Sequence, residues 1–323
     1  MRPFGAVCLA CLMLACLMLS CLMLVGGGQA QTQIRVDVSL VNVAFSVRDA
    51  RGTLVANLTR DDVEVTEDGV PQKITFFGRS ADVPLNLGLI MDVSGSQQSF
   101  VKPHLKDLEA FLKNVMDSED RAFLICFANR VRLVSDYSGS GKELVAALRE
   151  AEKGKGNAEY PIVGPPEYRI LGTAFYDAIY EPANLMFTGS TRGRRALIVF
   201  SDGEDNSSAH HMLEAIEAAQ ANDVTLFCLR YTEPGRNGRV TARNKYGTSV
   251  MARIARETGG LDFDAQAHGL QEGFRQIGAQ LRSSYELGYQ TSNPSGDKTF
   301  HKIAIRTKQP GFEVRAKTGY YSR

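Results

Sequence analysis

Apolar and polar residues alternate directly after residue 33. Ile34, Val36, Val38 and Leu40 share one phase of this alternation, and the opposite phase holds Val41, Val43, Phe45 and Val47. Strict alternation predicts half-buried strands, and a slip by one residue predicts a bulge or a strand break. The alternation resumes at Val63, Val65, Ile74 and Phe76, on either side of the hairpin signal Asp68-Gly69. Residues 31–82 are therefore expected to form a β-rich segment.

From about residue 83 continuous apolar runs alternate with segments of helical spacing. The apolar runs predict strands at 85–91, 121–128, 131–134, 196–200, 224–229 and 261–263. Helices are expected at 98–117, 173–187, 209–221, 249–257 and 270–281. Strands that are apolar on both faces and alternate with helices are typical of a parallel sheet covered on both sides. Residues 83–290 are therefore expected to form a doubly wound, mostly parallel α/β domain.

The β pattern returns in residues 291–323. Strands are expected at 300–306 and 312–317, around the turn residues Gln309 to Gly311. Because β-rich segments flank the α/β domain on both sides, we expect residues 31–82 and 291–323 to pack together as one small β-domain. The alternative is two unrelated β extensions.

The amino-terminal segment, residues 1–30, has the pattern of an export signal. Arg2 precedes an apolar run from Ala6 to Val25, and the small residues Gly28 and Ala30 follow. We expect cleavage after Ala30, with a retained membrane anchor as the alternative because the run is just long enough to span a bilayer. A lipid-modified Cys21 is less favoured. The protein is therefore expected to be periplasmic, extracellular or envelope-associated.

Composition excludes few classes of protein. The chain has 323 residues, 37 basic and 36 acidic side chains, and a net charge of +1. This balance gives no general attraction to nucleic acid or to an anionic membrane, so neither is an expected partner. A membrane becomes relevant only if the amino-terminal segment is retained. Two long loops, at 153–170 and 232–247, interrupt the α/β pattern, and the second is basic.

Hydroxyl and carboxyl side chains follow the predicted strands of the α/β domain. Asp92, Ser94 and Ser96 come directly after the first apolar run, and Asp202 comes after the run at 196–200. Thr173 precedes a predicted helix. Ligands of open α/β sheets bind at the carboxyl ends of the strands. Oxygen ligands of this kind suit hard divalent ions such as Mg²⁺, so we expect a metal site here, with Mn²⁺ and Ca²⁺ as alternatives.

These residues resemble the metal-ion-dependent adhesion site (MIDAS) of the von Willebrand factor type A (VWA) family. The resemblance covers roughly residues 83–290, and all five expected positions are filled. The flanking segments are similar, more loosely, to bacterial VWFA-related domain proteins. The resemblance implies a six-stranded, Rossmann-like sheet in the order 3-2-1-4-5-6. That order would separate Cys126 from Cys228 by three strand spacings, about 14 Å, so these thiols are expected to be buried and free.

The resemblance also implies a function without catalysis. We expect an exported, metal-dependent protein-binding module for adhesion or scaffolding, whose protein ligand donates a carboxylate to the bound cation. One alternative is a Mg²⁺-dependent phosphohydrolase that uses Asp92, although Ser94 stands where such enzymes normally carry a second acid. Another alternative is a structural module of an envelope complex. The chain lacks the glycines of a serine-hydrolase elbow and of a dinucleotide site around residues 92–96.

Overall fold

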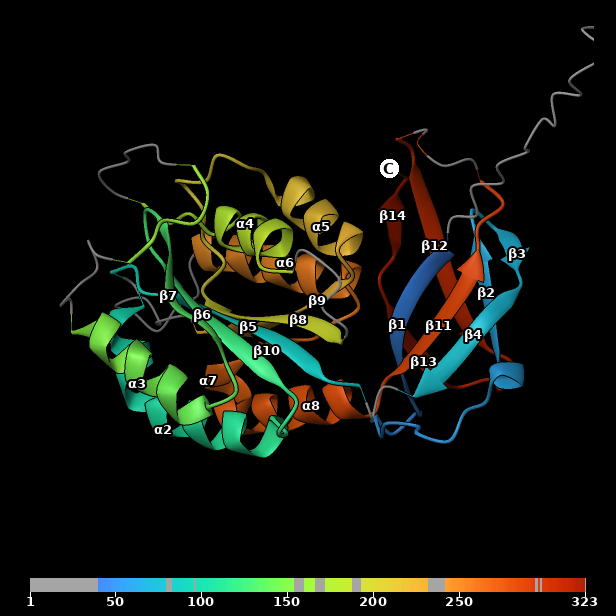
Figure 1. The fold of residues 1–323 in the computed structure, drawn as a ribbon, viewed down its shortest axis with the longest axis horizontal. Coiled ribbons are helices and arrows are strands. Elements are labelled where there is room, and N and C mark those ends of the chain that lie inside the picture. Colours follow the sequence, from blue (N-terminus) through green and yellow to red (C-terminus); the bar gives the residue numbers. More distant parts are fainter. Residues whose placement is uncertain are drawn as a thin grey trace, which may run out of the picture. The chain divides into compact units, whose positions relative to one another are not determined.

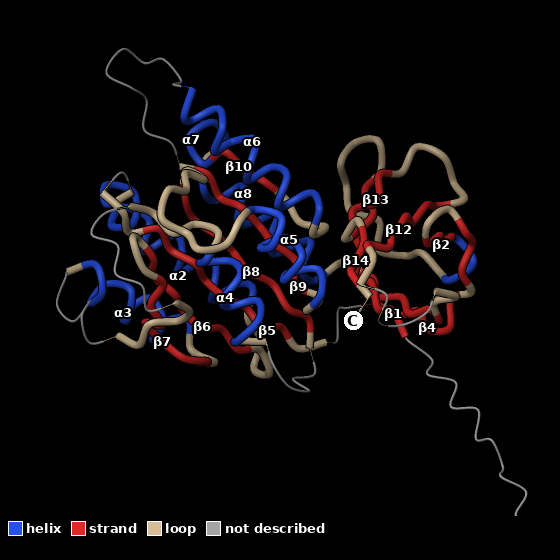
Figure 2. Tube along the Cα trace, turned by 90° about the horizontal axis from the view of Figure 1, so that it is seen from above, coloured by secondary structure: helices blue, strands red, loops and turns tan. Residues whose placement is uncertain are grey.

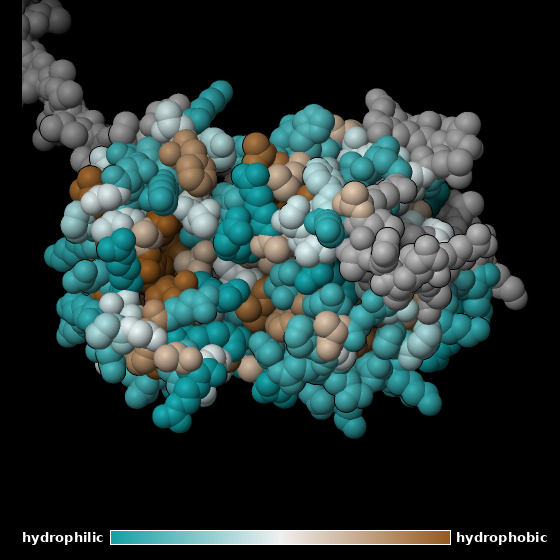
Figure 3. All heavy atoms as spheres, turned by 180° about the vertical axis from the view of Figure 1, so that it is seen from behind, coloured by the Kyte–Doolittle hydropathy of each residue, from teal (hydrophilic) through white to brown (hydrophobic). Residues whose placement is uncertain are grey.

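The computed structural model describes residues 40–79, 83–95, 97–153, 160–165, 172–187, 193–231, 242–293, 296 and 298–322. The predicted export signal and the predicted metal ligand Ser96 lie outside the described residues, as do residues 154–159 and 166–170 of the first predicted loop and 232–241 of the second. No helix in the described ranges is long and apolar enough to cross a membrane. Figure 3 shows that hydrophilic side chains cover most of the described surface on one face of the molecule.

Six strands form the central sheet of the α/β domain, in the order β10-β9-β8-β5-β6-β7. They are β5 (Leu85–Asp92), β6 (Arg121–Phe127), β7 (Val131–Ser138), β8 (Arg194–Ser201), β9 (Val224–Arg230) and β10 (Asp262–Asp264). All neighbours are parallel except β6 and β7, which are antiparallel. This architecture confirms the predicted fold class, a doubly wound and mostly parallel sheet.

Helices cover both faces of this sheet (Figure 1). One face carries α2 (Gln98–Val115), α3 (Gly141–Glu152), α7 (Ala265–His268) and α8 (Leu270–Arg282). The other face carries α4 (Asp177–Leu185), α5 (Met212–Ala221) and α6 (Ala242–Glu257). Every residue of β5 is buried, because each of its faces meets a helical layer.

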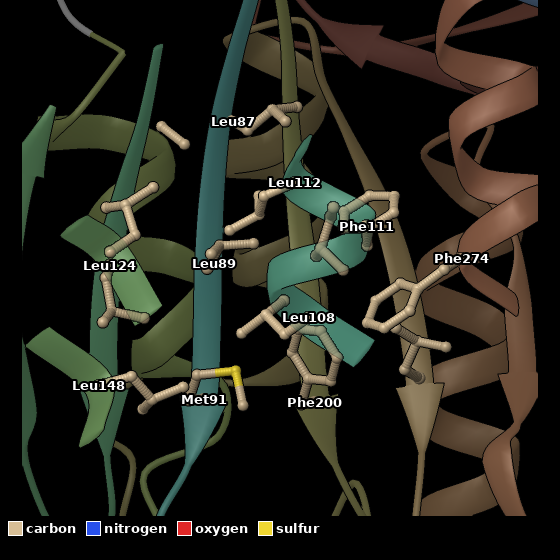
Figure 4. Close-up of a cluster of buried hydrophobic side chains, with 14 of the residues drawn as sticks. Leu87, Leu89, Met91, Leu108, Phe111, Leu112, Leu124, Leu148, Phe200 and Phe274 are labelled. Atoms are coloured by element: carbon tan, nitrogen blue, oxygen red, sulfur yellow. The ribbon is translucent and has the colours of Figure 1, made fainter. Parts of the chain in front are cut away.

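Alternate residues of β5 enter two separate cores. Leu87, Leu89 and Met91 pack with side chains of α2, α3 and α8, as Figure 4 shows. Ile90 packs on the opposite face, in the core that α4, α5 and α6 cover. Gly88 also faces that second core, where a Cβ atom would lie 2.4 Å from both Leu197 and Phe123. The glycine therefore gives these two large side chains the space in which they meet.

Helix α3 was not among the predicted helices. Its buried residues Leu144, Val145, Leu148 and Ala151 have helical spacing, and Ser140 caps its first turn by accepting from the Glu143 backbone N–H at 3.3 Å. The pattern was present in the sequence but is short. The other predicted helices and strands of the α/β domain are found, with shifted ends. The largest shift is in α6, which begins at Ala242, so residues 242–247 of the predicted second loop are helical.

Two further sheets contain strands from both ends of the chain (Figure 2). One has the order β13-β1-β11-β4 and the other has the order β14-β12-β2-β3. The strands are β1 (Leu40–Arg48), β2 (Val63–Glu67), β3 (Val70–Gln72), β4 (Ile74–Arg79), β11 (Tyr285–Gln290), β12 (Phe300–Thr307), β13 (Glu313–Ala316) and β14 (Gly319–Tyr321). A short 3₁₀ turn, Arg60–Asp62, precedes β2. We call these two sheets the β-domain.

The predicted boundary at residue 290 falls after β11, which the structure assigns to the β-domain. This strand pairs with β1 on one side and with β4 on the other. Its Tyr285 stacks on Phe45 with ring centroids 5.3 Å apart. The Tyr285 hydroxyl accepts from the Leu58 backbone N–H and donates to the Val55 carbonyl, each at 2.9 Å. Strand β11 therefore anchors the loop before β2 as well as its own sheet.

The two cysteines of the described chain are free and buried, as predicted. Cys126 lies on β6 and Cys228 on β9, and β8 and β5 separate these strands. The two side chains also enter different cores, on opposite faces of the sheet. Burial raises the pKa of Cys126 to about 12 and also raises that of Cys228, so both thiols stay protonated at neutral pH.

Gly88→Ala should destabilise the α/β domain. The added methyl overlaps Leu197 and Phe123, and overpacking of a filled core costs about 1–3 kcal/mol. Gly139→Ala is a matched control, because its Cβ would meet only the Asp120 carbonyl at 3.7 Å. Urea unfolding measures the free energy of unfolding of both variants. Equal stability would show that this contact is not tight.

Removal of residues 291–323 should unfold the rest of the β-domain. The deletion removes β12 and β14, so β2 loses its neighbour β12, and it removes β13 from beside β1. It therefore uncovers the buried side chains Val63 and Val65. Hydrogen exchange should lose protection in residues 40–79 while β5 and β8 stay protected. Retained protection in residues 40–79 would show that this segment folds without the C-terminal strands.

Candidate metal centre

The strand order of the central sheet reverses between β5 and β8. The chain proceeds from β5 to β6 and β7 on one side, and then returns to place β8 on the other side of β5. The two strands are parallel and pair Met91 with Phe200, so they end at the same edge. A crevice opens at such a switch point, outside the carboxyl ends of the strands. Asp92 ends β5, and Asp202 follows the last residue of β8.

Asp92 is almost completely buried, with 1% of its surface exposed. Its Oδ1 accepts from the Ser94 backbone N–H at 2.9 Å, and its Oδ2 accepts from the Ser201 hydroxyl at 2.6 Å. The pKa of Asp92 is raised to about 6, mainly by burial and also by the nearby charge of Asp202, while these hydrogen bonds act in the opposite direction. None of the groups that shift this pKa is a cation. Asp92 is thus a buried carboxylate that a bound cation would stabilise.

Asp202 is also buried, with 5% of its surface exposed. The Glu204 backbone N–H donates to its Oδ1 at 3.0 Å, and Gln97 Nε2 donates to its Oδ2 at 3.1 Å. Gln97 also donates to the Tyr231 carbonyl at 3.2 Å, so it ties three loops together. Gln97 Oε1 is buried and has no hydrogen-bond partner among the described residues. An oxygen acceptor therefore remains unsatisfied directly beside the carboxylate pair.

The segment before α4 is bonded to the segment after β8. The Thr173 backbone N–H donates to Asn206 Oδ1 at 2.7 Å, and the Asn206 N–H donates to the Thr173 carbonyl at 3.1 Å. Asp205 accepts from the backbone N–H of Phe175 at 2.9 Å. These bonds hold Thr173 next to the loop that begins at Asp202.

Asp177 completes this connection from the first turn of α4. Its carboxylate accepts from the backbone N–H groups of Ala209 and His210, at 2.8 and 3.0 Å. The ring Nδ1 of His210 lies 2.8 Å from the same carboxylate. The loop after Asp202 is therefore fixed along most of its length.

By sequence, Glu204 and Asp205 would suit the solvated entry of the next helix, with Asn206 or Ser207 as its cap. Asp205 is instead half-buried and binds the segment before α4, and burial raises its pKa. Helix α5 begins later, after His211, whose backbone N–H donates to Glu214 at 2.8 Å. The missed signal is that Asp and Asn side chains readily accept from backbone N–H groups of a neighbouring turn.

The structure brings four of the predicted ligands to one edge of the sheet and describes no position for the fifth. Asp92 ends β5 and Ser94 lies two residues beyond it, Asp202 follows β8, and Thr173 is bonded to the Asp202 loop. Sequence reasoning missed Ser201 and Gln97, which contact the two carboxylates. Ser201 ends an apolar run, and its position beside Asp92 depends on strand pairing that no local pattern reveals.

Comparisons with known proteins gave matches among solved structures only. No family model matches the chain, and no curated protein sequence matches it. Conserved protein BatB from Bacteroides thetaiotaomicron is 18% identical, with 60% of this chain and 98% of that chain covered and a TM-score of 0.40. A von Willebrand factor type A protein from Catenulispora acidiphila is 13% identical, with 89% and 74% covered and a TM-score of 0.43.

A third similar structure is the vWF domain of the type V pili tip protein Mfa5 from Porphyromonas gingivalis. It is 12% identical, with 62% of this chain and 95% of that chain covered and a TM-score of 0.41. Three features of the central sheet identify the fold of the α/β domain. They are its strand order, its one antiparallel edge strand, β7, and the Asp-x-Ser turn after β5. The α/β domain is VWA-like.

The chemistry of this VWA-like site fits a hard divalent cation. The described donors are oxygen atoms of Asp92, Ser94, Thr173 and Asp202, which are the ligands that Mg²⁺ prefers. Two buried carboxylates of like charge lie close enough for one to raise the pKa of the other. A cation between them would reverse this repulsion, supply an electrophilic centre and attract an anionic ligand.

Mg²⁺ should stabilise the protein, and Asp92→Asn should abolish most of this effect. The variant keeps the size of the side chain and an oxygen for hydrogen bonding, but it loses the charge that would hold the ion. A ligand at one hundred times its dissociation constant adds about 2.7 kcal/mol to the free energy of unfolding. Thermal unfolding with and without Mg²⁺ measures the difference.

Asp136→Asn is the matched control for this experiment. Asp136 is an exposed strand carboxylate that also accepts from a backbone N–H, that of Tyr137 at 2.7 Å. It should keep the full response to Mg²⁺. An equal response in Asp92→Asn and Asp136→Asn would remove Asp92 from the metal site.

Proposed function

We propose that this protein is an exported binding module that recognises an acidic group of a protein partner through a divalent cation. The cation, Mg²⁺ in the first instance, binds Asp92, Ser94, Ser96, Thr173 and Asp202. The observation that carries the proposal is the pair of buried carboxylates at the switch point of the sheet, fixed there by Ser201 and Gln97. The role in the cell is adhesion or scaffolding outside the cytoplasm.

The hydrogen bonds at the site favour an anionic partner. Both oxygens of Asp92 and both of Asp202 already accept from protein donors, which withdraw part of their negative charge. The remaining ligands are neutral hydroxyls. A divalent cation held by these groups is incompletely neutralised, so it attracts a further oxygen anion. An Asp or Glu side chain, or a terminal carboxylate, supplies that anion in a protein partner.

The buried position of Asp92 does not favour the alternative phosphohydrolase. A carboxylate nucleophile has to reach the phosphorus of its substrate in line, whereas Asp92 is 1% exposed and both its oxygens are engaged. The position two residues later, Ser94, carries no acid for the leaving group.

Capture from an envelope extract tests the proposal. The tag-free mature chain, immobilised with Mg²⁺, should retain a partner that excess chelator releases and that restored Mg²⁺ binds again. Asp92→Asn should lose the partner, whereas Asp136→Asn should retain it. In the captured partner, a single Asp→Asn or Glu→Gln change should weaken binding as much as Asp92→Asn does.

Two results would contradict the proposed function. Binding that persists in chelator with Asp92→Asn would place the contact surface away from the metal. Phosphate release by the wild-type protein that Asp92→Asn removes would favour the enzyme.

A further inference from the structure

A second cluster of side chains able to bind a metal lies in the β-domain. Glu67 is the last residue of β2, Asp68 begins the turn to β3, and His301 lies on β12, which pairs with β2. One ligand atom from each of the three lies within 4.8 Å of the others. The Asp68-Gly69 turn has positive φ at both residues, which bends the chain so that the Asp68 side chain returns to β12.

In each of the three side chains, one polar atom lies within hydrogen-bond distance of a residue outside the cluster. Glu67 Oε2 accepts from the Tyr289 and Tyr320 hydroxyls, at 2.6 and 3.2 Å. Asp68 Oδ1 accepts from the Lys302 backbone N–H at 2.8 Å. His301 Nε2 lies 3.1 Å from the Thr299 hydroxyl. Partners of this kind orient the ligands of metal sites, where they hold the atom that does not touch the metal.

The other polar atom of each side chain points to one shared position. Glu67 Oε1, Asp68 Oδ2 and His301 Nδ1 lie 2.6, 3.2 and 3.0 Å from the same atom, Asn293 Nδ2. Asn293 Nδ2 occupies that position, and His301 Nδ1 also lies 2.8 Å from Asp68 Oδ2. A cation at this position would take the place of the amide nitrogen, and rotation of the Asn293 side chain would bring its Oδ1 to the ion as a fourth ligand. The cluster then offers four ligand atoms to a cation.

The charge of the cluster also calls for a cation. Glu67 is fully buried at 0% exposure, and its hydrogen-bond partners among the described residues are neutral hydroxyl and amide groups. Asp68 pairs with the imidazole of His301 at 2.8 Å, whereas no lysine or arginine in the described ranges forms an ion pair with Glu67. A buried carboxylate costs free energy unless a positive charge offsets it. A divalent ion at the shared position would lie next to both carboxylates.

We propose that Glu67, Asp68 and His301, with Asn293 as the fourth ligand, bind a divalent transition-metal ion of the Zn²⁺ class. The imidazole distinguishes this site from the all-oxygen set around Asp92, because nitrogen ligands favour Zn²⁺ over Mg²⁺ or Ca²⁺. Ligand atoms of a tetrahedral Zn²⁺ site lie about 3.3 Å apart, given bonds of about 2.0 Å. That separation lies between the 2.8 Å from His301 Nδ1 to Asp68 Oδ2 and the 4.8 Å limit of the cluster.

Such an ion would join segments far apart in the chain. Glu67 and Asp68 come from the first part of the β-domain, whereas Asn293 and His301 come from its last part. With four protein ligands the site is closed, as in metal sites that stabilise a fold rather than catalyse a reaction. The metal therefore holds the two halves of the β-domain together.

Zn²⁺ titration of the tag-free mature chain in an Asp92→Ala background tests this proposal, because that background removes the other metal site. Calorimetry should give one Zn²⁺ per chain, thermal unfolding should shift upward, and Co²⁺ should give the visible absorption of a nitrogen-ligated, four-coordinate ion. Asp68→Asn should weaken Zn²⁺ binding by about tenfold or more, since it removes a charged ligand but retains the acceptor for Lys302. His301→Gln should abolish the Co²⁺ absorption.

Asp49→Asn is the matched control. Asp49 is an exposed turn residue of the same domain that also accepts backbone N–H groups, those of Arg51 and Thr53. It should bind Zn²⁺ as tightly as the background protein. If His301→Gln fails to fold, Asp68→Asn decides the question, because its side chain is 42% exposed.

Equal affinity of Asp68→Asn and Asp49→Asn, or no Zn²⁺ binding in the Asp92→Ala background, would overturn the proposal. Either result would show that the cluster is a hydrogen-bonded network that closes without a metal. The outcome is independent of the proposed function, which depends on Asp92 and not on this cluster.

Discussion

The parallel pairing of β5 with β8 is the constraint on which the candidate metal centre depends. It brings the end of the first strand of the domain to the end of a strand more than a hundred residues later, as the Asp92–Ser201 hydrogen bond records. The residues between these two strands include β6 and β7, which lie on the other side of β5 in the sheet. Without the reversal of strand order, β8 would not lie beside β5, and Asp92 and Asp202 would not be neighbours on this edge. The position of the two buried carboxylates and of the loops that hold them follows from this one pairing.

Rigidity at this edge has a functional consequence. Thr173, Phe175 and Asp177 exchange backbone and side-chain hydrogen bonds with the loop after Asp202, so these two segments behave as one unit. A site whose ligands are already fixed loses less conformational entropy when an ion binds. Burying Asp92 and Asp202 close together lowers the free energy of unfolding of the domain. A bound cation would offset part of this loss, which would couple metal binding to the stability of the domain.

The sequence predicted the features that depend on local pattern. Continuous apolar runs marked the strands because both faces of a parallel sheet are buried, and the alternation from Val41 to Val47 marked the buried face of β1. The separation of Cys126 from Cys228 followed from the strand order that the family resemblance implied. Features that depend on tertiary contacts were not predictable in this way. Nothing near Asp205 in the sequence reveals that the backbone of Phe175 would be its partner.

The cluster around Glu67 illustrates the same limit more strongly. Glu67 and Asp68 lie over two hundred residues before Asn293 and His301 in the chain. Each of these residues alone is an ordinary strand, turn or loop residue. Only the pairing of β2 with β12 places His301 beside the Asp68-Gly69 turn. The two sites then differ in a way that follows from their donors. The proposed site at Asp92 offers oxygen atoms at the carboxyl edge of the sheet, a set that would suit a hard ion. The proposed site at Glu67 adds an imidazole within a hydrogen-bonded network, a set that would suit an ion of the Zn²⁺ class, so the two proposals differ in the metal they require.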